Sequence, residues 1–461
     1  MAITASDPLP ITLGADMSMS RAILHVENRY SFRDLSHLSW SYFVSCDAST
    51  EEIGVANLDI VREGQFELSL DHCAKRLVEL QGQSSRVLDC WLNIRGFLKE
   101  DQPWAKKGHE LVAQQLPVSI DGLERFVSAT AQGTLQEFDL TVEERPDYVT
   151  VSVPTNAPGQ PWVRVDRSTG TITSLSNPDT TSVLASAGGE VMTPGISPNF
   201  TRACTDNDRG GVDLLIGFVL PEPLRFLNPA IFFLYSVLVG ARDLSYAWSW
   251  NSLGFLPDAP PRSVCRKLDV SEERDRVVIT AQCDIVRNKG SKVLLRQTMV
   301  YTLFRNGRLH VKNSVAPQRS IKSVRTIPRV GLSLPLCSTL FNMTYCGRGE
   351  VENYPDRKAC ARMGVYDTTA RDNEFDYIVP SENGNKTDCR WVAFRDDQGR
   401  GIMVASEEGS TKPINVGASL NSQRELHAAL HTVDLEERRN GDGPVFATID
   451  YKMMGIAGDV R

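Results

Sequence analysis

The sequence predicts an all-β protein, and three observations support this class. Hydrophobic and polar residues alternate with a period of two over most of residues 22–120, as in half-buried antiparallel strands. The pair Asn306-Gly307 separates two alternating runs, which is the strongest short signal for a β-hairpin. No strands alternate with helical segments, so neither a Rossmann sheet nor a TIM barrel is predicted.

The first predicted domain is a small two-sheet sandwich over residues 21–120, preceded by a disordered segment at residues 1–20. Two alternating runs place the following residues on one side of a strand: Leu38, Trp40, Tyr42 and Val44, and then Leu88, Cys90, Leu92 and Ile94. No good helix is expected in this domain. The alternation weakens after residue 120, so residues 121–136 are predicted to be a linker.

The second predicted domain, residues 137–461, is a longer series of strands and hairpins. Trp162–Asp166 leads through a Ser-Thr-Gly turn into Thr171–Thr173, and Tyr301–Phe304 leads through Asn306-Gly307 into Arg308–Lys312. Two further runs, Val277–Ile279 and Val445–Tyr451, are predicted to be core strands.

One helix is predicted near the end of the chain. Ser422 and Glu425 have the spacing of a capping box, and the helix is expected to continue through Leu426–Leu435. His427 and His431 lie four residues apart, with Asp434 one turn further, a spacing that suits zinc. No third strong ligand is found, so a solvent-facing surface is the favoured interpretation and no metal is assigned.

Charge and cysteine usage limit the partners and the compartment. The net charge of -7 lacks the positive field that nucleic acid or an anionic membrane requires. The apolar stretch 212–240 carries three charged residues, and its uncharged part is shorter than the ~20 residues of a membrane span, so it is expected to form an interface. Ten scattered cysteines without a CxxC pair, and a first segment without a signal-peptide pattern, indicate a reduced, cytoplasmic protein.

The sequence contains no complete active site. Gly108-His109-Glu110 is not followed by the second histidine of HExxH, and neither a GxSxG nor a P-loop pattern is present. Adjacent glutamates on a strand point to opposite faces, so they are poor acid/base partners. No catalytic residue is assigned.

Two loop-like stretches carry the candidate sugar-binding residues. "FTRACTDNDRGG" (200–211) places short polar side chains before two glycines, and "GRGEVENYPDR" (347–357) is followed by "VPSENG" (379–384). Such residues can hydrogen-bond a sugar, but for each stretch taken singly turn architecture is the favoured interpretation. The candidates are Asp206, Asn207, Asp208, Gly210, Glu352, Asn353, Asp356, Arg357, Glu382 and Asn383.

Together and in this order, these stretches resemble the carboxy-terminal part of the β-galactosidases of glycoside hydrolase family 2. That family has Phe-x-Arg-Ala-x-x-Asn/Asp-Asn-Asp-x-Gly, Gly-x-Gly-Pro-x-Glu-Asn-Tyr-Pro-Asp-Arg, Pro-x-Glu-Asn-Gly and Met-Gly-x-Gly-Gly-Asp, the last seen here as "MGIAGD" (454–459). "VENRYSFRDLSHLSWSY" and "WAKKGHELVAQQL" extend the resemblance over nearly the whole chain.

The resemblance implies an immunoglobulin-like β-sandwich followed by a large galactose-mutarotase-like supersandwich. In the family the catalytic glutamates, with Mg and Na ions, lie in a barrel that precedes both sandwiches, so this chain is expected to be non-catalytic and to hold no cofactor. The expected partners are a barrel-bearing large chain, or a second copy, and a β-galactoside. The family's Asp-x-Ser-Trp is missing after the Met-Gly stretch, so the supersandwich is expected to lack its last strands. Glu350 replaces the motif's Pro, which is expected to loosen that loop.

Other interpretations remain open at this point. Glu352–Arg357 is expected to brace a loop more than to contact substrate, with an ion pair between Asp356 and Arg357. An aldose 1-epimerase would need a His and carboxylate pair, and neither His310, His427 nor His431 has an obvious carboxylate partner. A purely structural module is the third alternative, supported by the apolar stretch.

Overall fold

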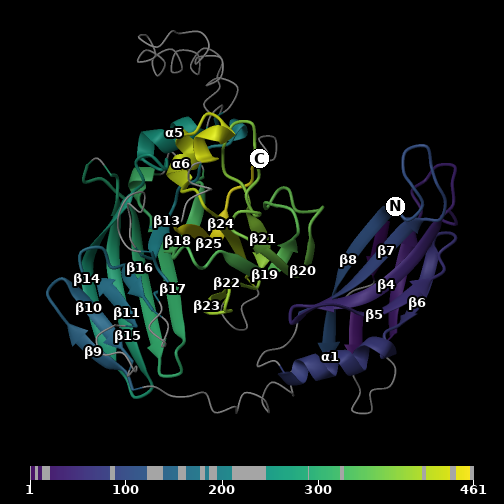
Figure 1. Cartoon of the computed structure of the whole chain (residues 1–461), viewed down its shortest axis with the longest axis horizontal. Helices are drawn as coiled ribbons and strands as arrows, with labels where there is room; N and C mark the ends of the chain where they lie inside the picture. The colour runs from purple at the N-terminus through teal and green to yellow at the C-terminus, as the bar shows by residue number, and fades with distance from the viewer. Residues whose placement is uncertain are drawn as a thin grey trace, which may run out of the picture.

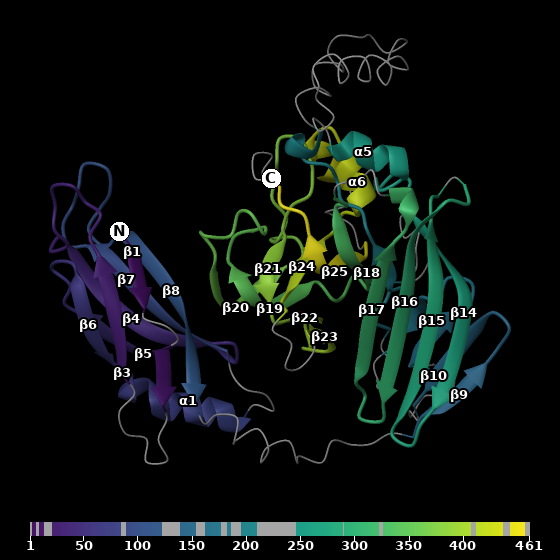
Figure 2. The same cartoon turned by 180° about the vertical axis from the view of Figure 1, so that it is seen from behind.

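A computed structural model describes residues 2–5, 9–12, 21–83, 89–121, 139–153, 162–176, 182–185, 195–209, 246–288, 290–321, 326–406, 412–436 and 443–456. Several predictions lie outside these residues, namely most of the linker, Leu88, Gly210, the apolar stretch 212–240 and the last three residues of "MGIAGD". Figures 1 and 2 show a smaller N-terminal unit beside a larger C-terminal unit. In the described part of the chain no helix is long and apolar enough to cross a membrane.

The smaller unit is a sandwich of a three-stranded sheet, β1-β3-β6, and a five-stranded sheet, β2-β8-β7-β4-β5. Its strands are β1 (Ala2–Ala5), β2 (Leu9–Thr12), β3 (Arg21–Glu27), β4 (Leu38–Cys46), β5 (Ser49–Leu58), β6 (Gly64–Ser69), β7 (Cys90–Leu98) and β8 (Glu110–Asp121). The alternating residues that the structure describes, among them Leu38, Trp40, Leu92 and Ile94, form its core. The period-two pattern therefore identified the buried face correctly.

Two parts of the smaller unit differ from the prediction. Within the segment predicted to be disordered, β1 pairs with β3 and β2 pairs with β8, because an open sheet edge can bind a short strand through its backbone. A helix, α1 (Asp71–Gln83), occurs where none was expected. Its buried residues Cys73, Leu77 and Leu80 recur every three or four positions, so a helical period was present between the flanking strands.

The described residues of the larger unit form four antiparallel sheets, in the orders β12-β11-β10-β9, β14-β15-β16-β17, β13-β18-β25-β24-β21 and β20-β19-β22-β23. Its strands are β9 (Thr141–Glu144), β10 (Tyr148–Ser152), β11 (Val163–Asp166), β12 (Ile172–Leu175), β13 (Ser197–Asn199), β14 (Arg262–Glu272), β15 (Arg276–Val286), β16 (Val293–Phe304), β17 (Leu309–Pro317), β18 (Arg329–Leu336), β19 (Asn342–Gly349), β20 (Arg362–Thr369), β21 (Lys386–Cys389), β22 (Trp391–Arg395), β23 (Gly401–Ala405), β24 (Ile414–Ser419) and β25 (Val445–Met453). Its helices are α5 (Tyr246–Leu253), η2 (Arg319–Ile321), α6 (Gln423–Ala428) and η3 (Thr432–Leu435).

One continuous core joins these four sheets. It includes Ile279 of β15, Tyr301 of β16, Val416 of β24 and Val445 of β25, none of which is exposed to solvent. The all-β prediction is confirmed. Both predicted hairpins are present, as β11–β12 and β16–β17, and the two predicted core strands lie within β15 and β25.

The predicted helix near the end of the chain begins as expected and ends earlier. The Ser422 hydroxyl accepts the Glu425 N–H, and the Glu425 side chain accepts the Ser422 N–H, so the capping box is present. The helix ends at Ala428, and Ala429 has an extended backbone. The continuation to Leu435 was wrong, because Asp434 accepts the N–H groups of Leu430 and His431 and so starts a separate 3-10 turn.

The two units contact each other through β7, β8 and β20. Trp91 packs against Met363 in a small apolar cluster. Gln115 donates from Nε2 to the Met363 carbonyl at 2.8 Å and accepts the Met363 N–H at 2.7 Å. Glu110 pairs with Arg362 at 2.7 Å. This contact explains why both faces of β7 are buried, whereas the sequence predicted one buried face.

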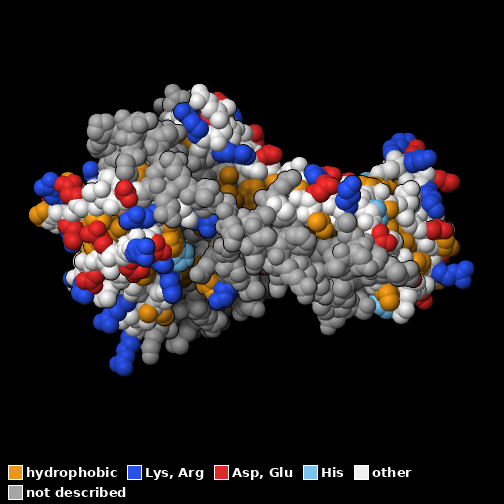
Figure 3. Space-filling view, turned by 90° about the horizontal axis from the view of Figure 1, so that it is seen from below, with side chains coloured by type: hydrophobic (Ala, Val, Ile, Leu, Met, Phe, Trp, Pro, Cys, Tyr) orange, Lys and Arg blue, Asp and Glu red, His pale blue; other side chains and the backbone are white. Residues whose placement is uncertain are grey.

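Charge is distributed without a dominant sign over the described residues on one face of the molecule. On the face shown in Figure 3, Lys and Arg side chains are interspersed with Asp and Glu side chains over both units. No single basic field of the kind that binds a polyanion is seen there.

Candidate functional site

A buried ion pair shapes the turn that follows Phe200. Arg202 and Asp208 are both buried, and Arg202 donates from Nε and Nη2 to the two oxygens of Asp208, at 3.1 and 2.6 Å. Asp208 also accepts the Thr205 N–H at 3.0 Å, and the Thr205 hydroxyl accepts the Asp208 N–H at 3.3 Å. Both Asp208 oxygens therefore bind groups of the protein itself.

The same turn is tied to the last described residues of the chain. Arg202 donates to the carbonyl oxygens of Met454 and Gly455, at 2.6 and 2.9 Å. Asn207 donates from Nδ2 to the Ile456 carbonyl at 2.7 Å. Two of the stretches that carry the resemblance, some 250 residues apart in the sequence, are thus joined by hydrogen bonds.

A third stretch reaches the same place through Asp356. Its Oδ1 accepts the Ile456 N–H at 3.2 Å, and a side chain at Gly455 would clash with the Asp356 carboxylate. Asp206 and Asn207 are exposed beside this contact, whereas Gly210 lies outside the described residues. In Figures 1 and 2 the end of the described chain lies near α5 and α6, at one end of the larger unit.

Glu352 gathers three donors. Its Oε1 accepts hydrogen bonds from Arg357 and from the Tyr377 hydroxyl, and its Oε2 accepts the Gly384 N–H at 2.8 Å. The predicted pair of Asp356 with Arg357 is wrong, because Arg357 forms its ion pair with Glu352. The turn explains this, since Arg357 folds back over the ring of Tyr354, with 5.7 Å from its guanidinium carbon to the ring centre.

Asn353 is fully buried and joins two loops. Its Nδ2 donates to the carbonyl oxygens of Arg348 and Val351, at 2.9 and 3.0 Å. Its Oδ1 accepts the N–H and the hydroxyl of Thr387, at 2.9 and 2.5 Å. All of its side-chain donors and one acceptor are used within the protein, so it is a brace between the two loops.

The loop Pro380–Asn385 is held by its own polar residues. Asn383 accepts the Phe375 N–H at 3.2 Å and donates to the Ser381 carbonyl at 2.9 Å. Glu382 is buried and lies 2.6 Å from the guanidinium of Arg329. The predicted residues Asp208, Asn353, Glu382 and Asn383 are therefore internal, while Asp206, Asn207 and Arg357 present polar atoms to the surface.

Arg329 binds a second buried carboxylate. Its Nη1 lies 3.3 Å from Asp450 Oδ2, and both residues are almost completely buried. Burial raises the pKa of Asp450 to about 7, although Arg329 opposes this and the charge of Glu382 adds to it. One guanidinium thus faces two carboxylates in the interior.

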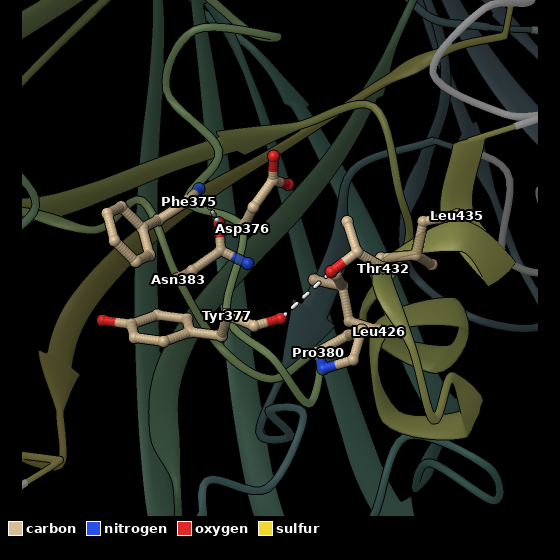
Figure 4. A pocket seen from close by; sticks show the side chains of 8 residues that line it. All are labelled: Phe375, Asp376, Tyr377, Pro380, Asn383, Leu426, Thr432 and Leu435. Carbon is tan, nitrogen blue, oxygen red and sulfur yellow. Dashed lines mark hydrogen bonds between the residues drawn. The ribbon is translucent and has the colours of Figure 1, made fainter.

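A shallow pocket lies beside the Pro380–Asn385 loop (Figure 4). It is lined by Phe375, Asp376, Tyr377, Pro380, Asn383, Leu426, Thr432 and Leu435. The Thr432 hydroxyl donates to the Tyr377 carbonyl across it, at 3.1 Å. Asp376 is the one charged residue in this lining. The pocket therefore does not place two carboxylates on opposite sides of a glycosidic bond.

The two histidines singled out in the sequence do not lie on one helix, because α6 ends between them. His427 lies in α6 and accepts the Cys204 N–H at Nδ1, at 3.3 Å, while His431 follows the end of the helix. Burial lowers the pKa of His427, with a further lowering from Arg209. No group of three metal-ligating side chains occurs in the described ranges.

Sequence reasoning missed Arg202, Arg329, Asp450 and Tyr354. Each is buried with little or no solvent exposure. Arg202 and Tyr354 stood inside the stretches singled out for their acidic and amide residues. The presence of arginine among apolar residues was the available signal, because a buried arginine requires carboxylate or carbonyl partners.

Comparisons with known proteins identify the family of the chain. The family described as Beta galactosidase small chain matches residues 159–460, and Beta-galactosidase, domain 4 matches residues 24–119. The chain is 25% identical over 435 residues to the Beta-galactosidase of Priestia megaterium, which covers 94% of this chain and 34% of that protein. It is also 25% identical to Beta-galactosidase 2 of Enterobacter cloacae, covering 96% of this chain and 36% of that protein.

The fold and the matches define an all-β protein of the β-galactosidase class. The chain belongs to the β-galactosidase small chain family and corresponds to a C-terminal portion of its relatives. It spans about a third of the length of the curated relatives described above.

Proposed function

We propose that this chain is the non-catalytic, carbohydrate-associated portion of a β-galactosidase. In this proposal it supports the hydrolysis of terminal β-D-galactosides by a barrel-bearing partner. The observation that carries the proposal is the meeting of "FTRACTDNDRGG", "GRGEVENYPDR" and "MGIAGD" at Arg202, Asp356 and Met454–Ile456, in a chain that belongs to the family.

The exposed members of the candidate set are the proposed sugar contacts. Asp206 presents a carboxylate, Asn207 keeps its amide oxygen while Nδ2 binds Ile456, and Arg357 presents part of its guanidinium. A few such polar groups on a rigid sandwich are typical of a carbohydrate-binding loop. The buried members would hold this surface in shape.

The proposed partner is the larger, barrel-bearing portion of a β-galactosidase, as a separate chain or as part of the same polypeptide. Self-association is the second possible mode of assembly. The metal ions of the reaction would be held by the barrel and not by this chain. A cytoplasmic location, a role in lactose catabolism and a galactose-mutarotase-like supersandwich for the larger unit belong to the same proposal.

The first test is galactoside hydrolysis with and without a partner. The purified chain would be assayed alone, and then with a barrel-bearing portion of a relative that lacks its own C-terminal third. We expect hydrolysis only when both are present. Hydrolysis by this chain alone would overturn the non-catalytic role.

The second test measures galactose binding to the assembled pair by calorimetry. We expect Asp206→Asn to weaken binding, because it removes the exposed carboxylate and leaves the buried Arg202–Asp208 pair intact. The matched control is Asp269→Asn, which alters an exposed carboxylate on β14 that pairs with Lys267 of the same strand. Equal binding by the two variants would remove Asp206 from the sugar site.

A further inference from the structure

Four polar side chains meet inside the larger unit, beneath the loop Pro380–Asn385. Arg329 on β18, Asp450 on β25, Glu382 in that loop and Tyr354 in the loop after β19 are each at most 3% exposed. Their sequence positions differ widely, and the sheet brings the first two onto neighbouring strands, with Asp450 opposite Gly331. The cluster lies in the interior, apart from the exposed residues proposed to touch sugar.

The charges in this cluster do not balance. Arg329 supplies one positive charge, and Glu382 and Asp450 supply two negative charges when both are ionised, at 2.6 and 3.3 Å from the guanidinium. The nearby Arg202 is already bound to Asp208 and to two carbonyl oxygens. An unbalanced charge in the interior is costly, so the cluster needs one further positive charge.

Atoms without a hydrogen-bond partner indicate where the additional positive charge binds. Neither oxygen of Asp450 receives a hydrogen bond from any described residue, and the Tyr354 hydroxyl, Glu382 Oε2 and the Nε and Nη1 of Arg329 also lack a hydrogen bond there. Glu382 lies nearer to Arg329 than Asp450 does, so Glu382 is the better compensated carboxylate. A metal cation is disfavoured because the guanidinium already occupies the space between the two carboxylates, whereas a proton needs no additional room.

We propose that Arg329, Glu382, Asp450 and Tyr354 form a buried proton-binding site that stabilises the folded larger unit. The proton comes from solvent and is held on Asp450 as a neutral carboxylic acid, which turns an unpartnered acceptor into a donor. The loop Pro380–Asn385 is part of this site through Glu382, so its anchoring to the sheet depends on the same proton.

The surroundings of Asp450 support a single titrating group. The charged groups that face it are Arg329 of β18 and Glu382 of the loop, and Asn415 of β24 donates from Nδ2 to the Asp450 carbonyl oxygen at 3.5 Å. Tyr354 acts on Arg329 and Glu382. On β25 itself, Tyr451 and Lys452 are exposed. Burial raises the pKa of Tyr354, so its hydroxyl keeps its proton.

The direction of the pH effect follows from Asp450. Its pKa of about 7 in the folded protein lies above the value of about 3.9 expected in an unfolded chain. The folded protein therefore binds one more proton than the unfolded chain between these values. The stabilisation is fully present below the unfolded pKa and is lost as the pH rises through about 7.

The experiment compares the wild-type chain with Asp450→Asn by urea unfolding from about pH 6 to about pH 8.5. The asparagine has the same shape and is neutral at every pH. We expect the unfolding equilibrium constant of the wild type, divided by that of the variant, to rise about tenfold across this range. A ratio that stays constant would overturn the proposal.

Two further measurements keep the test decisive. Asp388→Asn is the control, because Arg348 and Lys358 hold the pKa of Asp388 below its usual value despite burial. The unfolding equilibrium constant of the wild type, divided by that of Asp388→Asn, should therefore not change in this range. If Asp450→Asn does not fold, the infrared carbonyl band of a buried protonated carboxyl group is followed in the wild type. Loss of this band between about pH 6 and pH 8.5 supports the site, and its absence at pH 6 refutes it.

Discussion

Replacing Asp208 by alanine is expected to destabilise the larger unit by about 3 kcal/mol. The change removes both oxygens that bind Arg202, at 3.1 and 2.6 Å, and leaves the guanidinium buried. Removing one partner of a buried ion pair costs about 3–5 kcal/mol. The lower end applies because Arg202 keeps its hydrogen bonds to the carbonyl oxygens of Met454 and Gly455.

The assay is urea unfolding followed by tryptophan fluorescence at neutral pH. Trp250 is a local reporter, because the Arg202 guanidinium carbon lies 5.5 Å from the centre of its ring. Asp269→Ala is the control, since Asp269 pairs with Lys267 on the surface and such pairs contribute little to stability. A loss of less than about 1 kcal/mol in Asp208→Ala would refute the argument from burial.

A double variant distinguishes the loss of the ion pair from the cost of leaving one charge buried without a partner. Arg202→Met combined with Asp208→Leu replaces both members by apolar side chains, so no buried charge is left without a partner. We expect the double variant to be more stable than Asp208→Ala, because much of the single-variant cost is the uncompensated guanidinium. If the loss of stability in the double variant equals the sum of the losses in Arg202→Met and Asp208→Leu, the two residues stabilise the turn independently.

Three further substitutions test residues that hold the loops and α6 in place. Asn353→Ala should cost at least about 3 kcal/mol in urea unfolding, because it leaves buried amide and carbonyl groups of two loops without partners; a cost under about 1 kcal/mol would contradict this role. Gly455→Ala should lower the melting temperature by several degrees through a clash with Asp356, whereas Gly82→Ala, on open space in α1, should not lower it. Ser422→Ala should cost about 1 kcal/mol by removing the cap of α6, and an unchanged stability would show that the capping box is dispensable.

Strands were predictable from the sequence because their evidence is local. Alternation along β4 and the Asn-Gly turn between β16 and β17 each involve fewer than a dozen residues, and both gave the correct element. α1 was missed although its buried residues have a helical period, because the strands on either side dominated the interpretation. The early end of α6 was missed because Asp434 binds backbone N–H groups that a continuous helix would have used.

The contacts of the loops depend on distant residues and were not predictable in this way. The Arg329 partners lie 53 and 121 positions further along the chain, at Glu382 and Asp450. No local pattern relates such positions. The contact of Gln115 with Met363 likewise joins two units, and it buried a face of β7 that alternation had assigned to solvent.

Residue type alone did not distinguish a carboxylate that binds sugar from one that holds an arginine. Asp206 and Asp208 stand two positions apart in a stretch that suggested sugar binding for both. Asp206 is exposed, whereas Asp208 is buried, with 1% of its surface exposed. The distinction follows from the turn, since the first residues of a helical turn point in different directions and Thr205 directs Asp208 inward. Glu352 and Asn353 are both internal, because the Glu352 side chain is 10% exposed and binds Arg357, Tyr377 and Gly384, while Asn353 braces two loops. Loop motifs of this kind therefore combine ligand contacts with the buried polar residues that hold them, and exposure in the folded chain separates the two.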